Sequence, residues 1–81
     1  MRIEKIDRAD EDEPITTIVE AESLEALGRT ETAALLVDDR FCPCYGYPKE
    51  FEAKIENDHM SIEWSPGDGG AYTIAEYRVL E

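Results

Sequence analysis

Alternation of apolar and charged residues is clearest in the C-terminal half of the chain. In "EFEAKIE", residues 50–56, apolar side chains alternate with charged ones, and "MSIEW", residues 60–64, repeats the alternation. A period of two is typical of half-buried strands. Asn57-Asp58 lies between the runs, and both residue types tolerate the backbone of a tight turn. The pattern therefore predicts a β-hairpin whose polar side chains share one face.

The last segment, "AYTIAEYRVLE", predicts a third strand of the same meander. Its apolar positions before Ala75 are out of phase with those after Glu76. One extra residue in a strand restores such a phase, so we expect a β-bulge near Ala75 or Glu76.

Two further strands are predicted near the N-terminus. "MRIEKIDR", residues 1–8, alternates imperfectly and predicts a short edge strand. The β-branched run "ITTIVEA", residues 15–21, predicts the second strand. Four consecutive acids and Pro14 lie between them, which predicts an extended connecting loop.

A helix is predicted directly after the second strand. Ser23 occupies the N-cap position, and the following apolar residues recur at helical spacing. Gly28 weakens the middle of this helix by up to ~1 kcal/mol relative to Ala. One bent helix and two short helices are therefore both compatible with the pattern. The apolar stripe consists of Leu24, Leu27, Ala34 and Leu35.

The element order β-β-α-β-β-β predicts an α+β fold in a single compact domain, residues 1–81. We expect a small antiparallel sheet, made of the C-terminal three-strand meander plus the N-terminal strands. One helix, or a broken helix, is expected to pack on one face of this sheet.

Charge restricts the classes of partner. Twenty acidic against eight basic residues give a net charge of −12, which disfavours direct contact with nucleic acid or an anionic membrane. A basic surface of a larger protein or ribonucleoprotein complex is attracted instead, and salt weakens the attraction. Solubility in a salt-adapted organism is the alternative explanation. No run approaches the ~20 apolar residues of a membrane span, and a cytoplasmic protein is expected.

Carboxylates in two places are the candidate partner-binding groups. Residues two apart on a strand are about 7 Å apart, comparable to the phosphate spacing of a single nucleic-acid strand. A row of carboxylates can thus occupy a groove meant for phosphates. These candidates are Asp10, Glu11, Asp12, Glu13, Glu50, Glu52, Glu56 and Glu63.

Residues 40–51, "RFCPCYGYPKEF", hold both cysteines of the chain. With His59 they offer three potential zinc ligands, but one C-x-C pair and a single His do not match the spacing of zinc knuckles. No metal site or cofactor is therefore predicted, and the thiols are expected to flank a proline bend as small hydrophobes. Tyr45 and Tyr47 complete the candidate set: exposed, they would anchor a partner; buried, they would cap the core.

Catalysis is the least favoured class of function. One His on a predicted turn beside a thin core does not supply a water-excluding nucleophile–base pair. The Gly-rich "GDGG" lacks the following helix and the Lys of a phosphate-binding loop. The sequence predicts a non-enzymatic protein.

In general character the chain resembles small acidic proteins of phages and mobile elements, of the anti-CRISPR inhibitor type. The segment "ITTIVEAESLEAL", the short meander after it and the carboxylate excess carry the resemblance over most of the chain. These families share no diagnostic motif, so no functional residue is transferred. The resemblance implies a non-catalytic inhibitor, in the host cell cytoplasm, that binds a CRISPR effector and blocks DNA or guide engagement.

Three hypotheses follow from the sequence. The first is an acidic binding protein, monomer or homodimer, that occupies a basic nucleic-acid-binding surface. The second is a small zinc-linked regulator using Cys42, Cys44 and His59. The third is an acidic accessory protein of a salt-adapted organism.

Overall fold

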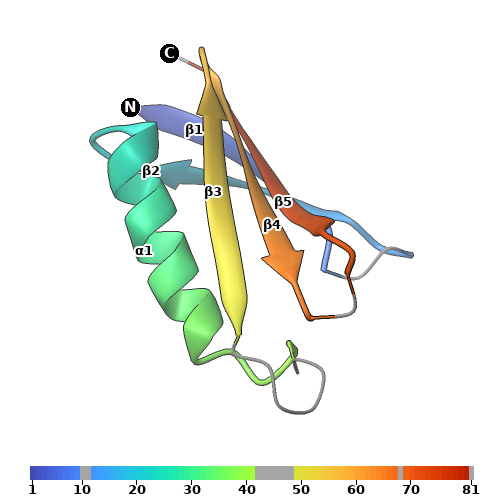
Figure 1. The fold of residues 1–81 in the computed structure, drawn as a ribbon. Helices are drawn as coiled ribbons and strands as arrows, with labels where there is room; N and C mark the ends of the chain where they lie inside the picture. Colours follow the sequence, from blue (N-terminus) through green and yellow to red (C-terminus); the bar gives the residue numbers. More distant parts are fainter. Residues whose placement is uncertain (10–11, 42–48, 68, 81) are drawn as a thin grey trace.

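The computed structural model describes residues 1–9, 12–41, 49–67 and 69–80 of the chain. Its elements follow one another in the predicted order and confirm the α+β fold class (Figure 1). They are β1 (Arg2–Asp7), β2 (Ile15–Glu20), α1 (Leu24–Leu36), β3 (Glu50–Glu56), β4 (His59–Ser65) and β5 (Tyr72–Val79).

The strands form one antiparallel sheet in the order β2-β1-β5-β4-β3. The predicted meander supplies β3, β4 and β5, and Asn57 adopts a positive φ of 55° in the hairpin turn. β1 was predicted as an edge strand, and this prediction is wrong: it lies between β2 and β5. Ile3 of β1 is completely buried. Glu4, Lys5 and Asp7 of the same strand are half-buried, and their ion-pair partners are Arg78, Glu31 and Arg40.

The predicted β-bulge is present, at Ile74. Ile62 of β4 pairs with Ala75, whereas the next residue, Glu63, pairs with Thr73. Ile74 is thus the extra residue of β5, directly before the predicted position. The bulge allows the consecutive residues Ile74 and Ala75 both to be buried, which strict alternation would not permit.

Helix α1 begins at the predicted N-cap. The Ser23 hydroxyl oxygen accepts a hydrogen bond of 3.1 Å from the backbone N–H of Ala26. The helix continues without a break through Gly28. A Cβ atom at Gly28 would lie 3.0 Å from the sulfur of Met60 and 3.2 Å from the Cβ of Ala53. The missing side chain therefore lets the helix approach β3 and β4 closely.

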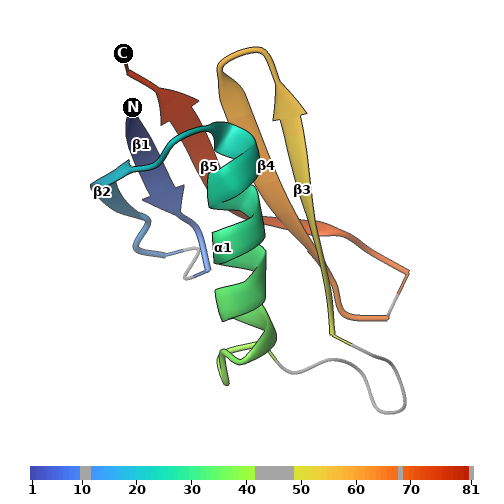
Figure 2. The ribbon, with the colours of Figure 1, turned by 90° about the vertical axis from the view of Figure 1, so that its left-hand side faces the viewer.

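The helix lies on one face of the sheet, over β3 and β4 (Figure 2). Leu24 and Leu27 are buried there, but Ala34 is exposed and does not belong to the apolar stripe as predicted. No described element covers the opposite face of the sheet, which we call the helix-free face. The buried core consists of Ile3, Leu24, Leu27, Phe41, Met60, Ile62, Ile74, Ala75 and Tyr77.

Candidate functional site

Four of the predicted partner-binding carboxylates lie together on the helix-free face. Glu50, Glu52 and Glu56 occupy alternate positions of β3, so their side chains project from the same side of the sheet. The hairpin register places Glu63 of β4 directly opposite Glu52. The first three residues are exposed and Glu63 is half-buried. We call this group the acidic hairpin face.

The register brings like charges close together at its centre. Directly opposed residues of antiparallel strands have Cβ atoms about 5 Å apart, and like charges in such pairs destabilise a sheet. Lys54 offsets part of this repulsion, because its ammonium nitrogen lies 3.2 Å from a carboxylate oxygen of Glu63. Apart from His59, Lys54 is the one residue of β3 and β4 with a basic side chain. The acidic hairpin face therefore remains net negative.

Sequence reasoning missed the ionic groups that β1 and β5 contribute to the same face. Arg78 lies 3.2 Å from Glu4, and the Arg8 guanidinium donates a hydrogen bond to Glu76. The pairing of β1 with β5 brings these residues together. The pattern within one strand cannot predict such pairs, because their members are 74 and 68 residues apart in the sequence. They make the middle of the helix-free face mixed in charge, unlike the hairpin.

A shallow groove of about 490 Å³ runs across this face. Glu4, Arg78, His59 and Glu56 form one row across β1, β5, β4 and β3, and all four line the groove. Glu4 and Glu56 at the two ends of the row are negative, and Arg78 between them is positive. Such a surface can accept polar or charged groups of a partner, and it has no enclosed volume that excludes water.

The remaining predicted carboxylates lie elsewhere. Asp12 and Glu13 are exposed in the turn before β2, at the opposite edge of the sheet from β3. Four strand spacings separate the two edges, or about 19 Å. The structure therefore does not bring these two residues together with the acidic hairpin face. Asp10 and Glu11 lie outside the described residues.

Tyr45 and Tyr47 also lie outside the described residues, as do Cys42 and Cys44. The predictions made for this segment stay predictions. His59, the third potential zinc ligand, is exposed at the start of β4. Among the described residues no three His, Cys, Asp or Glu side chains gather into a metal-binding group.

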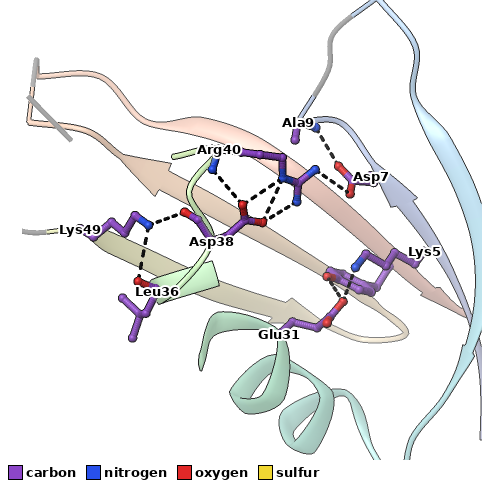
Figure 3. Close-up of polar contacts among 9 residues, drawn as sticks. Lys5, Asp7, Ala9, Glu31, Leu36, Asp38, Arg40 and Lys49 are labelled. Atoms are coloured by element: carbon purple, nitrogen blue, oxygen red, sulfur yellow. Dashed lines mark hydrogen bonds and ion pairs between the residues drawn. The ribbon is translucent and has the colours of Figure 1, made fainter. Parts of the chain in front are cut away.

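A second polar cluster lies between the helix and β1 (Figure 3). One carboxylate oxygen of Glu31 accepts a hydrogen bond of 2.6 Å from the Lys5 ammonium and one of 2.8 Å from the Tyr77 hydroxyl. The Tyr77 side chain is buried, and burial, followed by its hydrogen bond to Glu31, raises the pKa of Tyr77 far above its usual value of 10.0. The phenol therefore stays protonated and acts as a fixed donor.

The same cluster continues into the segment after α1. Arg40 donates hydrogen bonds of 2.7–3.2 Å to Asp38 and lies 3.7 Å from Asp7 of β1. These bonds from Arg40 hold the pKa of Asp38 below its usual value. The Lys49 ammonium donates to the backbone carbonyls of Leu36 and Asp38 (Figure 3), where the helix dipole favours a cation.

This cluster fits a structural role better than a chemical one. It borders a cavity of about 90 Å³ lined by Lys5, Glu31, Asp38 and Arg40, among others. Each of these four side chains already has an oppositely charged partner. Ion pairs of this kind hold α1 and its following segment to β1, and they leave none of these four side chains without a charged partner.

Aromatic rings form a third feature, at the end of the sheet where β3 begins. Phe41 is buried and makes edge-to-face contacts with Phe51 and Trp64, with ring centroids 5.4 Å and 5.2 Å apart. The indole N–H of Trp64 is buried, and no described residue accepts a hydrogen bond from it. These rings close the core at the end of the sheet where β3 begins.

Helix α1 has 13 residues, and no described helix is long and apolar enough to cross a membrane. Comparison with protein-family models, with curated proteins and with solved structures finds no match to this chain.

Proposed function

We propose that this chain is a non-catalytic binding protein that places its acidic hairpin face on a basic surface of a larger protein or ribonucleoprotein. The observation that carries the proposal is the convergence of Glu50, Glu52, Glu56 and Glu63 on one uncovered side of the β3–β4 hairpin. Glu52 faces Glu63 at a cost to the stability of the sheet. The Lys54–Glu63 ion pair offsets this repulsion only in part, and the remaining negative charge supports attraction to a basic surface.

A basic surface that holds a phosphate backbone is the complementary partner. Glu50 and Glu52 are about 7 Å apart along β3, and Glu56 follows about 14 Å beyond Glu52 with Lys54 between them. We propose inhibition of the anti-CRISPR type. In this function the acidic hairpin face displaces DNA or guide RNA from a CRISPR effector. The mixed charge of the middle of the helix-free face gives the docking surface a defined boundary.

Competition with nucleic acid tests this function. The immobilised chain is incubated with bacterial lysate at low salt, and bound proteins are eluted first with duplex oligonucleotide and then with a sodium chloride gradient. We expect the specific partner to elute with the oligonucleotide, because both ligands need the same basic surface. We also expect retention to decrease steeply with salt.

Matched variants locate the surface. Glu50→Gln with Glu52→Gln removes two charges from the acidic hairpin face, and Glu25→Gln with Asp39→Asn removes two from exposed positions in the first turn of α1 and just after its end. The first pair should weaken retention by about tenfold, as for the loss of charged contacts at an interface, and the second by less than about twofold. Equal effects of the two pairs, or retention that is insensitive to salt, would contradict the proposal.

The two other hypotheses remain open to direct tests. Native mass spectrometry that finds bound zinc would favour the regulator that uses Cys42, Cys44 and His59. Folding that requires molar salt would favour the accessory protein of a salt-adapted organism.

A further inference from the structure

The outer edge of β2 exposes backbone groups that no described strand pairs. β2 is the terminal strand of the sheet, next to β1. Met1 and Ala21 exchange two backbone hydrogen bonds, of 2.7 Å and 3.2 Å, at one end of this strand pair. Bonded and non-bonded pairs alternate along an antiparallel ladder. The register therefore directs Val19, Thr17 and Ile15 toward β1.

Thr16, Ile18 and Glu20 consequently direct their N–H and carbonyl groups away from the sheet. Each provides one donor and one acceptor, at intervals of about 7 Å. Pro14 occupies the next outward position and has no N–H, so the ladder that a further strand can form ends there. This edge is a short template for one added strand.

The central residues of β2, Ile15 to Val19, carry none of the usual protection of an edge strand. Proteins usually protect an edge strand with charged residues, proline or a covering element. The other edge strand, β3, carries Glu and Lys at alternate positions, whereas Ile15 to Val19 contain no charge. Ile15 on one face of the sheet and Ile18 on the other are 60% and 50% exposed. The helix packs over β3 and β4 and leaves β2 uncovered (Figure 2).

We propose that the outer edge of β2 is a strand-addition site for an extended segment of a partner protein. The segment is uncharged and β-branched over its centre and carries Lys or Arg at both ends. Backbone bonds to Thr16, Ile18 and Glu20 supply the attachment, as in known modes of β-strand addition. Ile15 and Ile18 offer apolar contact on the two faces.

Charge selects this occupant over a second copy of the chain. Glu13 is exposed before β2, and Glu20 and Glu22 are exposed at its end. Antiparallel pairing of two copies would bring the end of β2 near Glu13 of one copy to the end near Glu20 and Glu22 of the other, and parallel pairing would also bring acid next to acid. Each copy further carries a net charge of −12. A segment with cationic ends instead gains attraction at both ends of β2.

A designed peptide tests the site directly. The probe is a fluorescein-labelled peptide of alternating valine and threonine with a pair of lysines at each end, titrated with the full chain and followed by fluorescence anisotropy. We expect saturable binding, together with slower hydrogen exchange of the Thr16, Ile18 and Glu20 amides in NMR spectra. A version N-methylated at its central residues cannot donate to the edge and should bind at least about tenfold more weakly.

Variants of β2 provide the matched comparison. Ile18→Pro removes one outward N–H and leaves the bonds to β1 in place, because proline is tolerated where an edge strand faces solvent. It should weaken peptide binding by about tenfold, whereas Ile18→Val, which keeps the N–H, should change it by less than about twofold. If Ile18→Pro does not fold, the N-methylated peptide and the hydrogen-exchange data on the unaltered chain still test whether the peptide binds the edge of β2.

Several results would overturn this site. They are absence of binding at millimolar peptide, equal binding of the N-methylated peptide, and equal binding of a peptide with glutamates at its ends. A dimer in which the same three amides are protected without peptide would assign the edge to a second copy. Because the site lies at the opposite edge of the sheet from the acidic hairpin face, its failure leaves the proposed function standing, and the converse also holds.

Discussion

At Gly28, helix propensity and side-chain packing favour different residues. Glycine in a helix interior costs about 1 kcal/mol relative to alanine, so helix propensity alone favours a side chain there. Packing requires the opposite, because a Cβ atom would meet Ala53 at 3.2 Å and the Met60 sulfur at 3.0 Å. Met60 can shift its flexible side chain, but the Cβ of Ala53 is fixed to the backbone of β3.

Gly28→Ala should therefore lower the free energy of unfolding by about 1 kcal/mol, since overpacking costs about 1–3 kcal/mol and exceeds the gain in propensity. Urea unfolding followed by circular dichroism measures the change. Ala53→Gly in the same chain should restore part of the loss. A Gly28→Ala protein more stable than the original would show that the helix and β3 separate easily.

Tyr77 makes stability depend on pH in a predictable direction. In the unfolded chain its phenol ionises near pH 10, whereas in the folded protein burial and Glu31 raise its pKa. The stabilising contribution is therefore complete below pH 10, and it decreases as the pH rises above 10, where the unfolded state loses the proton first.

Tyr77→Phe provides the test of this dependence. Below pH 10 the variant should be less stable by about 1 kcal/mol, because it lacks the hydrogen bond to Glu31. Above pH 10 the difference should shrink by up to ~1.4 kcal/mol per pH unit. Unfolding by urea at several pH values measures both proteins, and a difference that stays constant through pH 11 would contradict the assignment.

At the scale of elements, the end of α1 depends on a residue far along the chain. Asp38 and Asp39 follow the helix, where the dipole disfavours negative charge. Arg40 neutralises Asp38, and the Lys49 ammonium donates to the carbonyls of Leu36 and Asp38. The last turn has no basic residue of its own, so Lys49 supplies the missing cation.

Lys49→Met should lower the free energy of unfolding by about 0.5–1 kcal/mol through loss of this interaction with the helix end. Arg29→Met is the matched control, because it removes one positive charge from an exposed position in the middle of α1. Thermal unfolding of both variants shows which substitution lowers the stability more. Equal losses would mean that Lys49 does not stabilise the helix end.

The order of strands in the sheet could not be predicted from the residue pattern of each strand. Each strand was predicted from its own residues, and the hairpin between β3 and β4 followed from Asn57-Asp58. The position of β1 did not follow, because its alternating charges also suit an edge strand. Only its pairing with β5, in which Ile3 meets Val79, makes it an inner strand.

At the scale of the whole molecule, a net charge of −12 on 81 residues opposes folding through self-repulsion. Raising sodium chloride from ~10 mM to ~0.15 M shortens the screening length from ~30 Å to ~8 Å. The melting temperature should therefore rise over this range. Scanning calorimetry measures it, with Glu50→Gln plus Glu52→Gln as a variant whose smaller charge should reduce the salt effect. A salt-independent melting temperature would mean that the carboxylates are too far apart to repel one another.

The sequence by itself determined the strands, the helix and the alternation that puts Glu50, Glu52 and Glu56 on one side of β3, because backbone periodicity depends on neighbouring residues alone. It also set the excess of negative charge. The two-residue turn at Asn57-Asp58 also sets the hairpin register that places Glu63 opposite Glu52. Only the tertiary structure decided that β1 lies between β2 and β5, and that Asp12 and Glu13 lie at the opposite edge of the sheet from β3. Those outcomes depend on strand order, which is fixed by contacts between residues far apart in the chain.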